Sequence, residues 1–379
     1  METFLSQLIF GIQRGTIYAL IALGYTMVYG VVRLINFAYG EVFMIGAFAS
    51  FFLVNALDLP QPILIVLAFL IPMAVCSLLG LAMDALAYRP LRQKPRLAAL
   101  ITAIGVSFFL GNFVSYSSGT TIRNSAGFAF ILVFFLLLYV LGVKYLNFPV
   151  KATPAFRPRK FIIPIVSLLL MGIIFWISKD FLLDLRWKGS SFASYPVDRL
   201  LQVKKIHLYK AVYITNIQIM NILISIALMV LLSYLVNRTL LGMAMRASKN
   251  NKDAVSLMGI NVDRIISITF IIGTALAGAA GVLSGITYPR LTAFMGVQPG
   301  LKAFIAAVLG GIGSIEGAML GGILMGVAEQ FAIGLLPSNY GPNHMDFTPL
   351  ADGVAFAILI GVLLLRPQGI FGEPPREKL

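Results

Sequence analysis

Long apolar runs follow one another along almost the whole chain, and this feature restricts the fold more than any other. A helix of about 20 apolar residues crosses the roughly 30 Å hydrocarbon core of a bilayer. We expect spans near residues 4–30, 35–57, 62–83, 97–117, 128–146, 161–178, 213–236, 262–287, 301–313, 317–336 and 350–366. Because a bilayer admits only helices and closed barrels, and segments of about 10 alternating residues typical of barrel strands are missing, the sequence predicts an all-α polytopic membrane helical bundle.

The expected bundle has about 10–11 transmembrane or re-entrant helices in a single domain, residues 1–379. The run at 301–313 is too short to span comfortably and could equally be a half-helix that enters the bilayer and returns. The opening METFLSQLIF has no basic region and no cleavage site, so we expect the first helix to be retained.

Composition also indicates a membrane protein, and it predicts one partner of the chain. Hydrophobic residues make up 59% of the chain and charged residues 12%, whereas a soluble domain carries roughly 25% charged residues. The 29 basic and 15 acidic residues give a net charge of +14, but the basic residues gather in the short loops between apolar runs. This is the positive-inside pattern of a membrane protein, so the predicted partner is the lipid bilayer and not nucleic acid.

Three loops rich in lysine and arginine set the expected orientation, at residues 84–96, 147–160 and 237–264. Two predicted spans separate each loop from the next, so a single orientation places all three in the cytoplasm. The protein is then a multi-pass protein of the cell (inner) membrane with its N-terminus outside and its C-terminus cytoplasmic. The segment 179–212 falls outside, although it also carries many lysines and arginines.

The inventory of reactive residues argues against an enzyme. The two histidines, His207 and His344, lie in separate loops far from a second His or Cys, so neither a HExxH motif nor a Cys/His zinc set can form. The run GGIGSIEG departs from the dinucleotide-binding pattern, and no G-x-x-x-x-G-K-[ST] run is present. We therefore predict no catalytic residue, no metal and no cofactor on this chain; any ATP would be used by partner subunits.

Ionisable residues inside apolar spans are costly and often functional. They are Arg14, Glu41, Asp84, Lys302, Glu329 and Asp352, most of them near predicted helix ends and Glu329 the deepest. A proton- or sodium-coupled carrier would be expected to show more acids, in matched halves. The segment RLINFAYGEVFMIGAF places Arg33 in a cytoplasmic turn, Asn36 at a helix N-cap and Glu41 about a turn further in.

Asn36, Glu41 and Glu329 are the candidate residues for a translocation path or gate. For Glu41 the alternative, an acid that merely begins a helix well, stays open.

Small residues recur at helical spacing in two places. One ladder is Gly273, Ala277, Gly281 and Gly285; the other is Gly313, Gly317 and Gly321, with Gly322 and Gly326 alongside. Such ladders allow close packing of helix backbones. The glycines Gly310, Gly311 and Gly313 permit a break between two helices. A hinge that moves during transport is the alternative to simple close packing.

The segment 238–265 is too polar to cross a membrane and too regular to be a plain linker. Ala254, Val255, Leu257 and Met258 form an apolar face; Asn250 or Asn251 can cap the helix start, Gly259 can end it, and Asn261 can cap the next span. We predict one or two short surface helices. They fit a groove on another protein, or else lie as a solvated loop on the lipid headgroups.

Several motifs together resemble the permease subunits of branched-chain amino-acid ABC importers of the LivHM type. They are GTIYALIALGYTMVYGVVRLINFAYGEVFMIGAF, ALAYRPLR, LITAIGVSFFL, GMAMRASKNNKDAVSLMGINVDRIISITFIIG, LKAFIAAVLGGIGSIEGAMLGG and the ending RPQGIFG, and they cover roughly residues 8–118 and 215–372. The resemblance implies a channel made with a second related permease subunit, two ABC ATPase subunits and a periplasmic or extracellular substrate-binding protein that delivers leucine, isoleucine or valine.

By the same resemblance, the loop at about 238–264 is the segment that couples to the ATPase. The residues concerned are Arg246, Ala247, Ser248, Asn251, Ala254 and Gly259. Two features depart from the family. Tyr39 stands where the family usually has His, and residues 119–214 form an insertion with two extra apolar helices.

We therefore expect an ATP-driven importer subunit for branched-chain or related amino acids. The same architecture serving urea, short amides or another small polar solute is the nearest alternative, and an autonomous secondary transporter is the more distant one. Genes for ATPases, a second permease and a binding protein beside this one would separate these classes.

Overall fold

The computed structural model of the chain describes residues 2–32, 36–91, 96–119, 193–209, 212–334, 348–366 and 368–372. The expected spans at 128–146 and 161–178, and most of the predicted insertion, lie outside the described residues. The same is true of Arg33 and His344.

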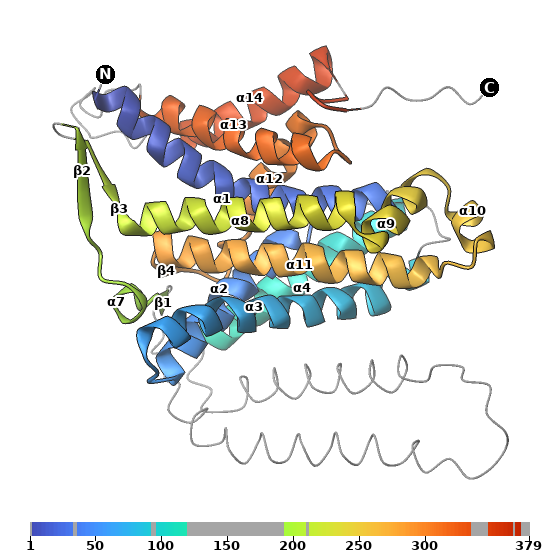
Figure 1. Cartoon of the computed structure of the whole chain (residues 1–379), viewed down its shortest axis with the longest axis horizontal. Helices are drawn as coiled ribbons and strands as arrows, with labels where there is room; N and C mark the ends of the chain where they lie inside the picture. The colour runs from blue at the N-terminus through green and yellow to red at the C-terminus, as the bar shows by residue number, and fades with distance from the viewer. Residues whose placement is uncertain are drawn as a thin grey trace, which may run out of the picture.

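Long helices lie side by side and form a bundle (Figure 1). They are α1 (Glu2–Val32), α2 (Tyr39–Ala56), α3 (Gln61–Met83), α4 (Arg96–Gly119), α8 (Asn216–Arg238), α11 (Val262–Thr287) and α13 (Ile315–Gly334). Helix α3 continues through a π-helical turn, η1 (Asp84–Tyr88), and a 3-10 turn, η2 (Arg89–Leu91). Within the described part, 7 helices are long and apolar enough to cross a membrane. The predicted polytopic helical bundle is confirmed.

Two shorter helices complete the bundle, α12 (Val297–Gly310) and α14 (Thr348–Leu365). Helix α12 has 14 residues, about 21 Å of helix, which is shorter than the hydrocarbon core. It ends three residues before the expected run 301–313 does, because Gly311 and Gly313 have φ angles of 105° and 99°. Such left-handed backbone suits glycine and ends the helix, as the glycine run predicts.

Helices α1 and α11 occupy the centre of the bundle. The most apolar window of α1 is 89% buried, whereas that of α4 is 22% buried. Helix α1 packs against α11, α12 and α13, and α11 packs against α2 and α3. The outer helices α3, α4 and α8 therefore leave apolar side chains for lipid or for another membrane subunit.

The first small-residue ladder lies on the face of α11 that meets α2. A Cβ added to Gly281 would lie 2.0 Å from the Phe43 carbonyl oxygen, and Gly273 lies beside the Tyr39 hydroxyl. Ala277 is fully buried in the same core. Gly285 lies further along, against the ring of Tyr195. The backbones of α2 and α11 approach so closely because these positions lack side-chain atoms.

The second ladder divides between two partners. Gly317 and Gly321 pack against α12, where an added Cβ would lie 2.2 Å from a backbone oxygen of Gly310 or Ala306 respectively. Gly322 and Gly326 pack instead against Ala19 and Gly15 of α1. Gly313 lies outside both helices, in the turn that joins α12 to α13. Helix α13 thus has one glycine face for each neighbour.

Short strands lie at one end of the bundle, and the all-α prediction did not include them. Strands β2 (Lys205–Tyr209) and β3 (Val212–Thr215) form an antiparallel hairpin, and β1 (Ala193–Ser194) pairs with β4 (Arg290–Leu291), with Ala193 opposite Leu291. The span expected from residue 213 therefore begins at Asn216. Thr215 and Gln218 form a capping box there, which fixes the start of α8 after the hairpin.

The segment around β1 and the short helix α7 (Val197–Leu200) is tied to the ends of the spanning helices. Ser50 donates to the Ala68 carbonyl (3.0 Å), so the Tyr195 hydroxyl donates to Ser50 across 2.6 Å. Burial raises the pKa of the Tyr195 hydroxyl to about 12, against the lowering effect of the Ser50 bond, so the phenol keeps its proton. This end of the bundle also holds the N-terminus and the hairpin, whereas α9 (Leu240–Asn250) and α10 (Lys252–Leu257) project at the opposite end (Figure 1).

Candidate functional site

Helix α2 begins inside the bundle and not at its surface. Its first residue, Tyr39, lies against Gly24 of α1 and Gly273 of α11. About 12 Å of helix separates Gly24 from Val32, the last residue of α1, and about 16 Å separates Gly273 from Val262, the first residue of α11. The start of α2 is therefore deep between its neighbours.

The start of α12 meets the start of α2 at the same depth. An added Cβ at Gly40 would lie 2.4 Å from the Gly296 carbonyl oxygen, and one at Gly300 would lie 2.8 Å from the Gly40 Cα. The N-cap residues of the two helices, Ala38 and Gly296, provide no side-chain cap. Two helix N-termini, each carrying partial positive charge, thus face one another inside the bundle and favour negative groups nearby.

The prediction that Asn36 is the N-cap of α2 is wrong, because a turn follows Asn36 and the helix starts later, after Ala38. Its Oδ1 accepts from the Ala38 backbone N–H (3.0 Å) and from the Tyr88 hydroxyl (2.6 Å). Asn36 is buried, and its Nδ2 atom has no hydrogen-bond acceptor among the described residues. It therefore joins the non-helical segment before α2 to the π-helical turn after α3.

Glu41 lies in the first turn of α2 and is 3% exposed. Ser107 of α4 donates to its Oε1 (3.0 Å), whereas its Oε2 is buried and has no hydrogen-bond partner within the described ranges. Tyr39 Oη and Thr26 Oγ1 are buried and unbonded in the same sense, and the Tyr39 and Tyr25 rings lie 5.1 Å apart. The predicted path residues Asn36 and Glu41 thus share a region where polar capacity is left unused.

Glu329, the third predicted path residue, lies in a separate cluster of charges, in which Glu329 and Lys302 are buried and Arg14 and Asp352 are half-buried. Its Oε1 accepts from Arg14 (3.1 Å) and from Lys302 (2.7 Å), and its Oε2 accepts from the Tyr18 hydroxyl (2.8 Å). Lys302 also bonds Asp352 at 2.7 Å. Two cations and two carboxylates from α1, α12, α13 and α14 therefore neutralise one another inside the bundle.

Sequence reasoning identified each of these four charged residues but did not pair them. The signal in the sequence is that cations and acids both occur inside apolar spans, since a charge buried there is stable only when it is paired. Arg14 also donates to the Tyr288 hydroxyl (3.2 Å), which links the cluster to the segment after α11. The cluster holds four helices together, and its oxygens have little capacity left for a ligand.

The predicted surface segment forms two helices, α9 and α10, where the sequence predicts one or two. Asn251 accepts from the backbone N–H groups of Asp253 and Ala254 and so begins α10; Gly259, with φ of 80°, follows its end. Asn261 caps α11 by accepting from the Arg264 N–H. The residues of the predicted apolar face differ in burial. Val255 is buried, while Leu257 and Met258 are 88% and 81% exposed.

The predicted coupling residues have different surroundings. Asn251, Ala254 and Gly259 are exposed, and Ala247 is half-buried. Arg246 bonds the Val236 carbonyl at the end of α8, and so holds α9 against α8. Ser248 is fully buried and donates to the Ala244 carbonyl (2.8 Å). Ser248 therefore contacts its own helix and offers no surface to a partner in this conformation.

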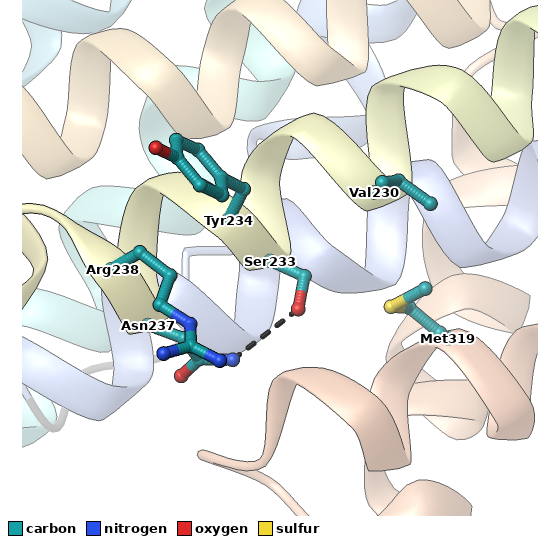
Figure 2. Close-up of a pocket in the computed structure, with 6 residues that line it drawn as sticks. All are labelled: Val230, Ser233, Tyr234, Asn237, Arg238 and Met319. Carbon is teal, nitrogen blue, oxygen red and sulfur yellow. Dashed lines mark hydrogen bonds between the residues drawn. The ribbon is translucent and has the colours of Figure 1, made fainter.

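A groove of about 530 Å³ lies between α8 and α13, away from these clusters. It is lined by Val230, Ser233, Tyr234, Asn237 and Arg238 of α8 and Met319 of α13 (Figure 2). Asn237 donates to Ser233 across 3.3 Å, and its Oδ1 accepts from Arg246. None of its lining residues is a predicted site residue, and the groove is open along the outer face of α8.

Membrane-length helices, charged side chains paired between them and two short surface helices at one end define a polytopic helical membrane protein. The chain belongs to the family described as branched-chain amino acid transport system / permease component, whose model matches residues 7–363. It is a permease subunit and a multi-pass membrane protein.

Three curated relatives align with this chain over 380 positions, and each alignment covers 99% of this chain and 98% of the relative. The high-affinity branched-chain amino acid transport system permease protein BraD of Pseudomonas aeruginosa is 36% identical. The permease proteins LivH of the corresponding systems in Salmonella typhimurium and Escherichia coli K12 are 35% and 34% identical. No solved structure matches the chain significantly.

Proposed function

We propose that this chain is a permease subunit of an ATP-driven importer of leucine, isoleucine and valine. The observation that carries the proposal is the similarity over 99% of the chain to permeases named for high-affinity branched-chain amino acid transport. In this proposal, substrate crosses by alternating access between helices of this chain and of a second, related permease subunit. A periplasmic or extracellular binding protein delivers it.

ATP is used by two partner ATPase subunits, and this chain carries no cofactor of its own. The α9–α10 segment is the proposed contact for one ATPase, because α10 presents Leu257 and Met258 almost fully to the surroundings. A short helix with an exposed apolar face fits a groove on a partner. The proposed contact residues are Arg246, Ala247, Asn251, Ala254 and Gly259, with Leu257 and Met258 added.

The same segment is linked to the helices that hold the buried site residues. Lys249 donates to the Gly313 carbonyl (3.2 Å) in the turn between α12 and α13. Lys252 donates to the carbonyl of Val32, the last residue of α1 (3.5 Å). A displacement of α9 and α10 by an ATPase would thus act directly on the α12–α13 turn, through Lys249, and on α1, through Lys252.

The α9–α10 end is proposed to face the cytoplasm, with the N-terminus outside. Basic residues gather at that end and include Arg238, Arg246, Lys249, Lys252 and Arg264. This distribution follows the positive-inside rule.

Reconstitution in liposomes tests the proposal, with the ATPase, permease and binding-protein subunits encoded beside this gene. Radiolabelled leucine should enter only when ATP and the binding protein are both present. Changing both Leu257 and Met258 to Asp should reduce copurified ATPase by tenfold or more, because losing apolar contacts worth at least 1.4 kcal/mol costs that factor.

Val203→Asp is the matched control, since Val203 is 52% exposed at the opposite end of the bundle. It should leave ATPase copurification unchanged. Leucine uptake by this chain alone in a proton or sodium gradient would contradict the proposal and indicate a secondary transporter. ATP-driven uptake of urea or a short amide, without leucine uptake, would assign the other substrate class.

A further inference from the structure

Glu41 is a buried carboxylate with only half of its bonding capacity used. Ser107 donates one hydrogen bond to Oε1, and Oε2 has no partner among the residues that the structure describes. An ionised carboxylate within the hydrocarbon region is costly unless a cation or several donors face it. Glu329, by contrast, is paired at both oxygens. Glu41 therefore requires a proton or a cationic group that comes from elsewhere.

The unpaired oxygen lies just behind the surface of the chain. A Cβ added to Gly111 of α4 would lie 3.7 Å from Glu41 Oε2 and 3.1 Å from the ring of Phe294. Phe294 is 48% exposed and precedes Gly296, the N-cap of α12. Val297 and Gln298, which follow that N-cap, are exposed as well. The Phe294 ring and Glu41 Oε2 thus lie beside the same position of α4, Gly111, close to the start of α12.

This region offers opposite charges a short distance apart. The uncapped N-termini of α2 and α12 favour a carboxylate, as at the broken helices of many transporters. Glu41 Oε2 favours a cation that can donate hydrogen bonds. The hydroxyl of Tyr39 also has no hydrogen-bond partner in the described part of the chain, and the ring of Tyr25 lies alongside, so polar and aromatic groups are present near the start of α2. A zwitterion with an apolar side chain matches all of these features.

We propose that Glu41 is the residue that binds the α-ammonium group of an amino acid as it passes the facing N-termini of α2 and α12. The inference rests on the proposed function and adds the group that recognises the charged amine. In the conformation described here Glu41 is buried beside Gly111 of α4, with the Phe294 ring against the same position, so binding requires side chains there to move aside.

Uptake by the reconstituted importer tests the role of the charge. Glu41→Gln should lower leucine uptake at least tenfold, while copurification of the ATPase and the thermal-unfolding midpoint of the complex stay close to wild type. Glu316→Gln is the control, because Glu316 is an exposed acid in the first turn of α13. If the wild-type complex takes up leucine and the Glu41→Gln variant takes it up equally well, the inference is overturned and the proposed function stands. If the wild-type complex takes up no leucine, the proposed function itself is overturned.

A second measurement uses the unmodified complex and so does not depend on a variant that folds. Dicyclohexylcarbodiimide reacts with protonated carboxyl groups in apolar surroundings, and its attachment at Glu41 can be located by mass spectrometry. Leucine should protect Glu41 from reaction, and 4-methylpentanoate, which is leucine without the ammonium group, should not. Equal protection by both, protection by neither or no reaction at Glu41 would overturn recognition of the ammonium group.

Discussion

Glu329 is the residue on which four helices converge. It is buried, and its two oxygens accept hydrogen bonds from Arg14 and Tyr18 of α1 and from Lys302 of α12. Lys302 also forms an ion pair with Asp352 of α14. A buried pair is weak evidence for high stability, because desolvation offsets most of the attraction. Removing one member of the cluster lowers stability much more, because it leaves the other members without their counter-charge. The cluster is therefore sensitive to the loss of a single charge.

Glu329→Gln should lower the free energy of unfolding by about 3–5 kcal/mol, the usual cost of breaking a buried ion pair. The thermal-unfolding midpoint of the purified complex in detergent reports the change. Glu316→Gln makes the same chemical change at an exposed position on the same helix and should cost about 1 kcal/mol or less. Equal shifts for the two variants would show that the cluster contributes no more than a surface charge.

At the scale of helices, glycine contacts decide how close α2 and α11 can lie. Gly46 of α2 meets Gly278 of α11 backbone to backbone, and Gly278 in turn meets Cys76 of α3. In a bilayer the hydrophobic effect does not drive helices together, so close packing of backbones contributes much of the attraction. The three helices therefore depend on positions that have no side chain.

Gly46→Ala should destabilise the bundle by about 1–3 kcal/mol, because the new Cβ would lie 2.6 Å from the Gly278 Cα. Gly105→Ala on α4 is the matched control, since a Cβ there meets nothing within 4 Å. Alanine should be neutral or slightly stabilising at that site, where it favours the helix by up to about 1 kcal/mol. Thermal unfolding and the monodisperse yield in detergent measure both variants. A tolerant Gly46→Ala would indicate that α2 and α11 can separate at no cost.

At the scale of the whole molecule, the two ends of the bundle differ in kind. The end with the N-terminus carries a β-hairpin and the β1–β4 pair, whereas the other end carries α9, α10 and the turn between α12 and α13 (Figure 1). Unlike ends are what the proposed function requires, with substrate received on one side and an ATPase bound on the other. The deep starts of α2 and α12 lie between them.

Cysteine labelling should establish which end faces the cytoplasm. The single native cysteine, Cys76, is fully buried and should not react. With a membrane-impermeant maleimide, Val203→Cys should be labelled in intact spheroplasts, and Leu257→Cys only after the membrane is opened, because both side chains are exposed at opposite ends. Labelling of Leu257→Cys in intact spheroplasts, with protection of Val203→Cys, would reverse the proposed orientation.

The sequence by itself determined the class of fold and much of the local structure. Runs of apolar residues set the helices, because their length must match the bilayer. Glycines ended α12 and α10 where left-handed backbone was needed, and Asn251 and Asn261 began helices through contacts with nearby backbone groups. These features depend on residues close together in the chain, so a sequence pattern is sufficient to predict them.

Only the tertiary structure decided which distant residues meet. It paired Glu329 with Arg14 and Lys302, left one oxygen of Glu41 without a partner among the described residues and turned Ser248 into the bundle. It also placed the start of α2 deep inside, which moved Asn36 out of the predicted N-cap. Charges and helix ends are paired through space by the packing of whole helices, and a local pattern does not specify the rotation and depth of each helix that determine those contacts.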